Sequence, residues 1–255
     1  MHRQFIGLLA ICACIGLCGG SLVSSREDAK IEKLTFASSG TSRTYYFYVP
    51  EKAAAGRAPL LLLLHGSGRD GKSLVDPWRR LAAEEGIVLV APDSTDRSGW
   101  STATDGPAFL HDLLELVRLT HDVVDDRRMY VFGHSAGAIH GLGMGVMESE
   151  YFAAVAAHAG VLNRNMAPLL TQAARKIPMA IWVGTDDALF PVKAVRATRD
   201  ALNANGFDTR LTEIAHHTHN YYDSAPRINA QVWAFLKEHR LAADPRFQPY
   251  QTISK

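Results

Sequence analysis

Short, unbroken runs of apolar residues alternate along this chain with longer amphipathic stretches. Pro59–His65, Ile87–Pro92 and Pro178–Val183 are apolar without polar alternation, which is typical of strands covered on both faces. Strands connected by helices form right-handed crossovers, so the sequence predicts an α/β fold with a mostly parallel sheet and helices on both faces. Further strands are expected at Arg43–Pro50, Met129–Phe132, Phe152–Ala157 and Thr209–Ile214, and helices at Leu74–Glu85, Ala108–Thr120, Ala138–Met147, Val192–Ala204 and Ala225–His239.

The alternation runs without a Pro/Gly/Ser-rich linker or an internal repeat, so a single domain over residues 30–241 is expected. A hydrophobic content of 47% in 255 residues is enough for one full-sized core. The tail at residues 242–255 contains prolines and few apolar residues, and is expected to run over the surface or fray. Functional side chains should gather in loops at the carboxyl ends of the strands.

Residues 1–20 have the pattern of an export signal. Arg3 precedes an uncharged apolar run, Ile6–Leu17, and small residues follow it. The run is shorter than the roughly 20 residues of a membrane-spanning helix, so we expect a cleaved signal peptide and a secreted or periplasmic protein. Because all three cysteines lie in this segment, lipidation at Cys14 or Cys18, which would anchor the protein to a membrane, stays open.

The charge and cysteine content exclude several functions for the domain. The formal net charge is +1, from 27 Lys+Arg against 26 Asp+Glu, which disfavours nucleic-acid binding. A domain without thiols has no disulfide, no Cys-bound zinc and no thiol nucleophile. No cofactor and no metal are therefore expected.

A Gly-x-Ser-x-Gly pattern follows the expected strand Met129–Phe132 and precedes a helix. The serine is Ser135, between His134 and Ala136. In this context the pattern predicts a nucleophile elbow, a sharp strand-to-helix turn that exposes the serine hydroxyl. A serine hydroxyl needs a neighbouring base, and the base needs an acid that orients it.

Candidates for that acid and base follow two later strands, in the chain order Ser, acid, His. Asp186 and Asp187 come after Pro178–Val183, and a histidine cluster with His217 and His219 comes after Thr209–Ile214. From the residues alone, either aspartate and either histidine qualifies. A metal site at the His-x-His pair is disfavoured because no further ligands stand at defined spacings.

Three more groups of residues are candidates for the site or for packing. Backbone N–H groups of Ser67, in the glycine-rich loop after Pro59–His65, and of Ala136 are candidate oxyanion donors; an ordinary glycine-rich turn is the alternative for that loop. Trp100 and His134 are candidate substrate-contacting residues, although Trp100 serves equally well as a packing residue. The remaining histidines outside the cluster are expected to pack or lie at the surface without partners: His111, His121, His140, His158 and His239.

Taken together, these motifs make the chain similar to the α/β-hydrolase superfamily, and within it to secreted esterases that include polyhydroxybutyrate depolymerases and feruloyl or acetylxylan esterases. The resemblance covers about residues 43–236, and it implies Asp187 as the acid and His219 as the base. The chain departs from that pattern at His216, where a glycine is common, and in lacking disulfides. The motifs that carry the resemblance are Arg43-x-Tyr45-x-Phe47-x-Val49-Pro50, Leu64-His65-Gly66-Ser67-Gly68, Gly133-His134-Ser135-Ala136-Gly137, Gly184-Thr185-Asp186-Asp187 with Pro191, and His217-Thr218-His219-Asn220-Tyr221-Tyr222.

The spacing between two expected strands argues against a large lid domain. Only residues 161–177 separate the strand after the nucleophile helix from the next one, which leaves room for one short helix. An open site suits esters on bulky or polymeric partners, such as acylated polysaccharide or a hydroxyacid polyester.

The sequence therefore predicts an exported serine hydrolase that cleaves carboxylic esters. Ser135 attacks the carbonyl, His219 acts as base and then as acid, and Asp187 orients the imidazole. Three alternatives remain: a serine peptidase of the prolyl-oligopeptidase type, a catalytically silent hydrolase fold that serves as a binding module, and a lipid-anchored scaffold.

Overall fold

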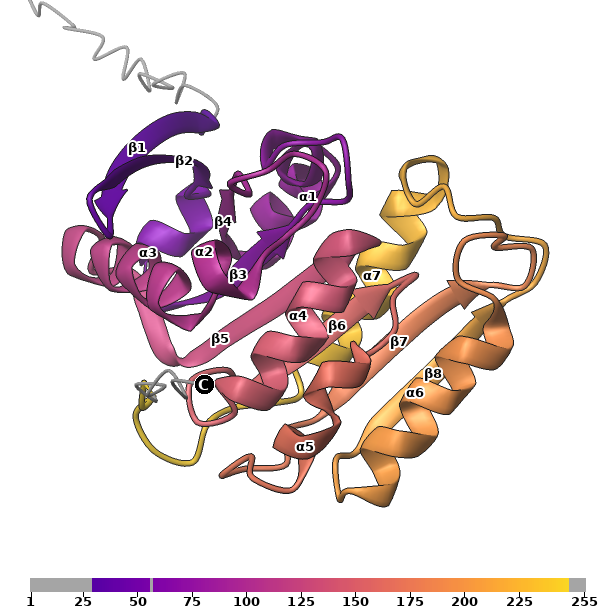
Figure 1. Cartoon of the computed structure of the whole chain (residues 1–255). Helices are drawn as coiled ribbons and strands as arrows, with labels where there is room; N and C mark the ends of the chain where they lie inside the picture. Colours follow the sequence, from indigo (N-terminus) through magenta and orange to yellow (C-terminus); the bar gives the residue numbers. More distant parts are fainter. Residues whose placement is uncertain (1–28, 56, 248–255) are drawn as a thin grey trace, which may run out of the picture.

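A computed structural model describes residues 29–55 and 57–247 of the chain (Figure 1). Eight strands form one sheet in the order β1-β2-β4-β3-β5-β6-β7-β8. β2 is antiparallel to β1 and β4, and the other neighbours are parallel. The strands are β1 (Glu32–Ser38), β2 (Thr41–Tyr48), β3 (Ala58–Leu64), β4 (Val88–Pro92), β5 (Val124–His134), β6 (Ala154–His158), β7 (Met179–Gly184) and β8 (Thr209–Ile214).

Helices cover both faces of this sheet. The α-helices are α1 (Lys72–Glu85), α2 (Thr102–Asp105), α3 (Pro107–Thr120), α4 (Ala136–Met147), α5 (Ala167–Leu170), α6 (Val192–Ala204) and α7 (Ala225–Leu236), and the 3-10 helices are η1 (Glu51–Ala55), η2 (Arg164–Met166) and η3 (Tyr222–Ser224). α1 and α7 pack on one face with side chains in one hydrophobic cluster. α3, α4 and α6 contribute to a second cluster on the other face, where α4, α5 and α6 lie in front of the sheet in Figure 1.

β3 shows why the apolar runs are strands and why they are buried. Every residue of this strand is buried. Leu60, Leu62 and Leu64 belong to one cluster, whereas Leu61 and Leu63 belong to the other. Successive side chains of a strand point to opposite faces, so an uninterrupted leucine run supplies apolar groups to both layers. The predicted α/β-hydrolase fold with a mostly parallel sheet is confirmed.

The sequence pattern does not predict strand β1, which the structure contains. It pairs with β2 as an antiparallel hairpin, and the turn places Ser39 and Gly40 at φ 49° and 75°. Most of its residues are exposed or half-buried, because the strand lies at the sheet edge. It therefore lacks the apolar run that marks the interior strands.

The connection between β6 and β7 contains only η2 and α5. This agrees with the absence of a large lid domain that the spacing predicts. In the part of the chain that the structure describes, no helix has both the length and the apolar character needed to cross a bilayer. The expected export signal and its cysteines lie outside the described residues.

The described part of the tail follows the surface near α3. Phe247 stacks on His111 with ring centroids 4.0 Å apart, and the Arg246 N–H donates to the Glu150 carbonyl. Residues 248–255 lie outside the described range.

Candidate active site

Ser135 lies at the sharp turn between β5 and α4. Its backbone has φ 57° and ψ −118°, a sparsely populated conformation for a residue with a side chain. The Ser135 N–H donates to the His158 carbonyl at 3.0 Å. A Cβ on Gly137 would lie 1.9 Å from the Leu64 carbonyl oxygen, so a glycine is required for the turn to pack against β3.

A chain of two hydrogen bonds joins Ser135 to a carboxylate. His219 Nε2 lies 3.0 Å from Ser135 Oγ, and His219 Nδ1 lies 2.9 Å from Asp187 Oδ2. A carboxylate only accepts, so the proton is on Nδ1 and Nε2 is free to accept the serine proton. The arrangement is that of a nucleophile, a base and an orienting acid.

Asp187 is held in this orientation from two sides. Its Oδ1 accepts backbone N–H groups of Leu189 and Phe190 at 2.9 Å each, and its side chain is 0% exposed. Phe190 also stacks on His219 at an interplanar angle of 18°. Asp186, by contrast, is half-exposed. The structure therefore brings Asp187 to His219, while Asp186 is exposed and lines the pocket next to the site.

His217 belongs to a buried chain of three imidazoles behind the site. His134 Nδ1 lies 3.1 Å from His158 Nδ1, and His158 Nε2 lies 3.1 Å from His217 Nε2. Burial lowers the pKa of His134 to about 3 and that of His158 to about 2, with neighbouring histidines adding to the effect. Burial also lowers the pKa of His217. These rings are neutral at ordinary pH, and each bond is N–H to N.

The candidate oxyanion donors lie next to the nucleophile. A Cβ on Gly66 would be 3.3 Å from Ser135 Cβ, so the loop after β3 passes directly against the turn at Ser135. Ser67 in this loop is exposed toward the pocket that contains Ser135. Ala136 is the first residue of α4, and N–H groups at a helix N-terminus favour developing negative charge.

Ser135 and His219 open into a pocket of about 620 Å³. Arg69 and Tyr222 line the same pocket, with the guanidinium 4.7 Å from the centre of the tyrosine ring. His134 contributes to the lining, but it is only 5% exposed and stacks on Tyr221. This candidate substrate-contacting residue is therefore mainly part of the supporting layer.

A second pocket, of about 480 Å³, lies beside Ala136. Trp100 forms one of its walls and donates its indole N–H to the His65 carbonyl at 2.8 Å. Its ring stacks on His140 at 18°. Trp100 is thus both a pocket wall and a packing residue.

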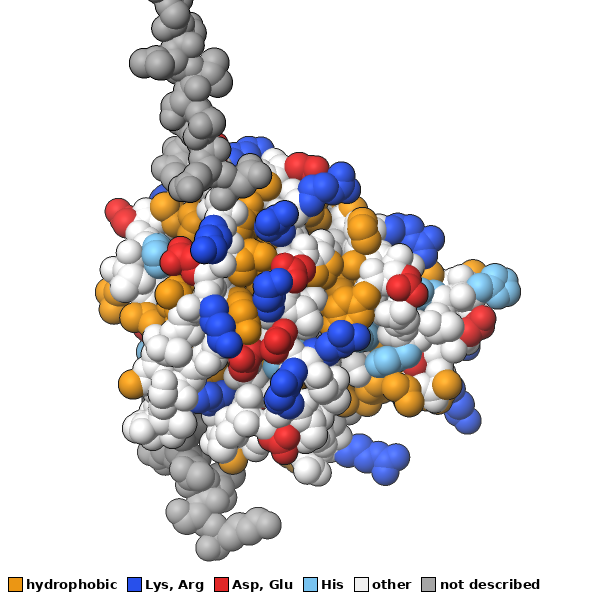
Figure 2. All heavy atoms as spheres, turned by 90° about the horizontal axis from the view of Figure 1, so that it is seen from above, with side chains coloured by type: hydrophobic (Ala, Val, Ile, Leu, Met, Phe, Trp, Pro, Cys, Tyr) orange, Lys and Arg blue, Asp and Glu red, His pale blue; other side chains and the backbone are white. Residues whose placement is uncertain are grey.

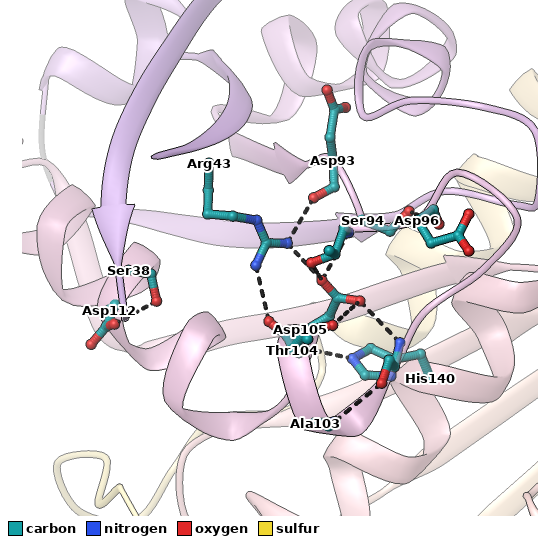
Figure 3. Close-up of polar contacts among 12 residues, drawn as sticks. Ser38, Arg43, Asp93, Ser94, Asp96, Ala103, Thr104, Asp105, Asp112 and His140 are labelled. Carbon is teal, nitrogen blue, oxygen red and sulfur yellow. Dashed lines mark hydrogen bonds and ion pairs between the residues drawn. The ribbon is translucent and has the colours of Figure 1, made fainter. Parts of the chain in front are cut away.

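The buried carboxylate of Asp105 holds the loop that carries Trp100, and Figure 3 shows this carboxylate with Arg43 and His140. Asp105 Oδ1 accepts from Arg43 at 2.6 Å and from the Thr95 N–H and hydroxyl, while Oδ2 accepts from the Ser101 N–H. The His140 ring is hydrogen-bonded to the Asp105 carbonyl. Burial raises the pKa of the Asp105 carboxyl, but these hydrogen bonds outweigh it and hold the pKa below its usual value.

Sequence reasoning misses the partners of three histidines. The expectation that they lack partners is wrong for His140 and His158, which are hydrogen-bonded, and for His111, whose Nε2 lies 3.8 Å from Glu115 Oε1. His158 is the last residue of β6, so the rule that points to the carboxyl ends of strands could have found it. Arg43 and Asp105 are 62 residues apart, and no local pattern connects them.

Charged side chains of both signs share the surface seen in Figure 2. The face in Figure 2 has Lys and Arg side chains interspersed with Asp and Glu and with hydrophobic groups. Among the residues with described positions, no group of three or more His, Cys, Asp or Glu side chains is arranged to hold a metal ion.

The sheet order, the turn at Ser135 and the hydrogen-bonded serine, histidine and aspartate are those of an α/β hydrolase. Residues 37–234 match the Esterase family, described as "Putative esterase", and the chain belongs to this family. It is 28% identical over 202 residues to the S-formylglutathione hydrolase of Bos taurus, covering 67% of this chain and 66% of that protein. The match thus spans just under two thirds of that relative.

Solved structures share the fold. An S-formylglutathione hydrolase from Agrobacterium tumefaciens superposes with a TM-score of 0.68 at 20% identity, covering 84% of this chain and 96% of that one. A ferulic acid esterase superposes with a TM-score of 0.66 at 17% identity, covering 83% and 98%.

Proposed function

We propose that this protein is a carboxylic ester hydrolase with Ser135 as nucleophile, His219 as base and Asp187 as orienting acid. The hydrogen-bonded series from Asp187 through His219 to Ser135 carries this proposal. The Ser135 end of this series faces a pocket, so an ester carbonyl can reach Ser135 Oγ. Membership in an esterase family supports the same reaction.

The reaction follows from these positions. Ser135 Oγ adds to the ester carbonyl while its proton passes to His219 Nε2, and backbone N–H groups of Ser67 and Ala136 bind the oxyanion. His219 then gives that proton to the leaving alcohol as the carbon–oxygen bond breaks. Water adds to the acyl-enzyme by the same relay, which releases the acid and restores Ser135.

Replacement of the nucleophile tests this assignment. Ser135→Ala should reduce kcat for p-nitrophenyl acetate by at least about a thousandfold, with unchanged circular dichroism. Reaction with a fluorophosphonate probe separates the enzyme from a catalytically silent binding module, because only an activated serine becomes labelled. Failure of the unaltered protein to label, or full activity in Ser135→Ala, would refute the proposal.

Thioester hydrolysis is a second candidate. The observation that favours it is the sequence similarity to S-formylglutathione hydrolase, since a thioester carbonyl reacts with the same nucleophile and relay. Comparison of kcat/KM for S-formylglutathione and p-nitrophenyl acetate decides between them. A value for the thioester at least a hundredfold higher would establish it as the substrate.

We also propose a polymeric or bulky ester as the substrate and export as the location. The short β6–β7 connection supports the first, because no lid domain lies in that connection over residues 159–178. Release of soluble acid from acylated xylan or polyhydroxybutyrate would test it, with prolyl peptide substrates as the peptidase control. Cell fractionation and mass spectrometry of the N-terminus test export, and Cys14→Ser with Cys18→Ser tests lipidation.

A further inference from the structure

The triad geometry fixes which side of Ser135 receives each part of an ester. In the tetrahedral intermediate the central carbon bears Oγ, the oxyanion, the leaving oxygen and the acyl carbon. The leaving oxygen must face His219 Nε2, which protonates it. The alcohol therefore extends into the pocket that His219 lines together with Leu189 and Tyr222. The acyl group must extend away from His219.

On the side away from His219, the pocket beside Ala136 is available for the acyl group. Ala136 follows the nucleophile directly, and the pocket continues from it along α4 to η2 and α5. Five apolar side chains line this pocket, together with the polar residues Thr102, His140, Asn163 and Asn165: Ile139, Met144, Met147, Met166 and Leu169. Methionine side chains adapt to ligands of different shape, and the lining suits a hydrocarbon chain.

The opposite wall of this pocket is rigid. Trp100 is fixed by its bond to the His65 carbonyl and by stacking on His140. Asp105 holds both ends of the same loop through the N–H groups of Thr95 and Ser101. The pocket is therefore preformed, and a chain that enters it loses little energy to rearrangement of the protein.

We propose that this pocket binds the acyl group and that the enzyme prefers esters with acyl groups longer than acetyl, from butyryl to octanoyl. The inference rests on the proposed function, since it assigns the two sides of the same nucleophile. A volume of about 480 Å³ lies within the size range of small-molecule sites. A formyl group would leave nearly all of it empty and would gain nothing from its apolar lining.

The test is a series of p-nitrophenyl esters from acetate to decanoate. Each methylene that becomes buried should raise kcat/KM about fourfold, so butyrate should exceed acetate about fifteenfold, with a decline once the pocket is full. Activity toward acetate that is lost in Ser135→Ala establishes the hydrolase independently of chain length. A flat or falling series from acetate onward would then overturn this inference while leaving the proposed function intact.

Substitutions that fill the pocket test where the acyl chain binds. A Cβ on Gly143 would meet only the flexible end of Met166, at 3.3 Å, so Gly143→Leu fills the pocket from α4. Thr102→Phe fills it from the opposite wall, where residue 102 is exposed. Either variant should lower kcat/KM for octanoate at least tenfold and leave acetate within about threefold. Because the walls are independent, misfolding of one variant leaves the other as the test.

The matched control is Ala197→Leu on α6. Ala197 lines a neighbouring apolar cavity of about 580 Å³ that adjoins the acyl pocket at Ile139 and Asn163 but is not lined by Ala136. We expect this variant to keep the whole acyl series unchanged. A loss for octanoate in Ala197→Leu, with none in Gly143→Leu and Thr102→Phe, would place the chain in the other cavity and overturn the assignment.

Discussion

Two buried polar networks support the surroundings of Ser135, and one consists of neutral rings whereas the other contains an ion pair. The first, the histidine network, consists of His134, His158 and His217, which are joined by N–H to N bonds. The second, the aspartate network, is the buried ion pair of Arg43 and Asp105 with the loop groups that bond to the carboxylate. Both hold loops that reach the site.

The comparison shows that the hydrogen bonds of each network require a different protonation state: neutral rings in the first network and an ionised carboxylate in the second. The histidine network keeps its bonds only while its rings are neutral, and burial lowers the pKa of each ring. The aspartate network keeps its bonds only while Asp105 is ionised, and its pKa lies below the usual value. As the pH falls, the contribution of the histidine network to stability should decrease first, because an unfolded histidine binds a proton from about pH 6.5 and an unfolded aspartate only near pH 3.9.

The largest expected effect comes from breaking the aspartate network. Asp105→Ala leaves Arg43, which is 8% exposed, without its carboxylate, and removal of one partner of a buried ion pair costs about 3–5 kcal/mol. Urea denaturation should show this loss in the free energy of unfolding. Asp105→Asn should lose less, because an amide oxygen still accepts hydrogen bonds. A loss below about 1 kcal/mol in Asp105→Ala would show that this network does not stabilise the fold.

The second effect is the acid sensitivity of the histidine network. The unfolded chain binds protons on His134 and His158 below about pH 6.5, whereas the folded chain resists them down to about pH 3 for His134 and about pH 2 for His158. Their contribution to stability is thus complete above pH 6.5 and falls progressively as the pH decreases. Between pH 7 and 5 the free energy of unfolding should drop by about 2 kcal/mol per histidine. Equal stability at pH 7 and pH 5 would contradict the assigned neutral state.

A substitution at the centre of the histidine network should have a smaller effect at neutral pH. His158→Leu removes both of its ring bonds and leaves two buried imidazoles with an unsatisfied atom, at a cost of about 1–3 kcal/mol. The loss between pH 7 and 5 should shrink by about 2 kcal/mol, because one titrating group is gone. His158→Gln, which can donate and accept, should recover part of the neutral-pH stability. An unchanged pH dependence in His158→Leu would exclude His158 from the acid response.

The smallest effect is expected at an exposed ion pair, which serves as the reference for both networks. Arg196 and Glu213 are bonded at 2.6 Å and 2.7 Å between α6 and β8, but the arginine side chain is 55% exposed. Exposed pairs contribute little to stability, because water and dissolved ions screen the attraction between the two charges. Glu213→Gln should change the urea midpoint little, and 0.5 M salt should remove the difference. A loss as large as that of Asp105→Ala would mean that burial does not distinguish these interactions.

The sequence alone predicts a structural element where a local pattern of residues marks the place of that element in the chain. The leucines of β3 and the turn around Ser135 carry such patterns, and residue order alone is enough to place both. The choice of Asp187 and His219 needs the family resemblance, since Asp186 and His217 occupy equivalent positions after their strands.

The pairings within the two networks cannot be predicted from the sequence, because they join residues that only the folded sheet brings together, although the place of His158 at the end of an expected strand marks it as a candidate. Arg43 is in β2 and Asp105 ends α2, while His134 and His158 meet only because β5 and β6 are neighbours. The edge strand β1 also escapes prediction, since its exposed face carries polar residues. Neither the contact between residues far apart in the sequence nor the place of a strand at the sheet edge leaves a recognisable pattern in neighbouring residues.

The strained backbone at Ser135 sets selection for stability against selection for turnover at this position. A side-chain-bearing residue at φ 57° and ψ −118° costs on the order of 1–3 kcal/mol, and glycine would adopt that geometry without the steric penalty. A mutation to glycine would therefore be rewarded by selection for a more stable fold and eliminated by selection for turnover. A serine retained here in descendants of this chain would be evidence that turnover is what selection maintains.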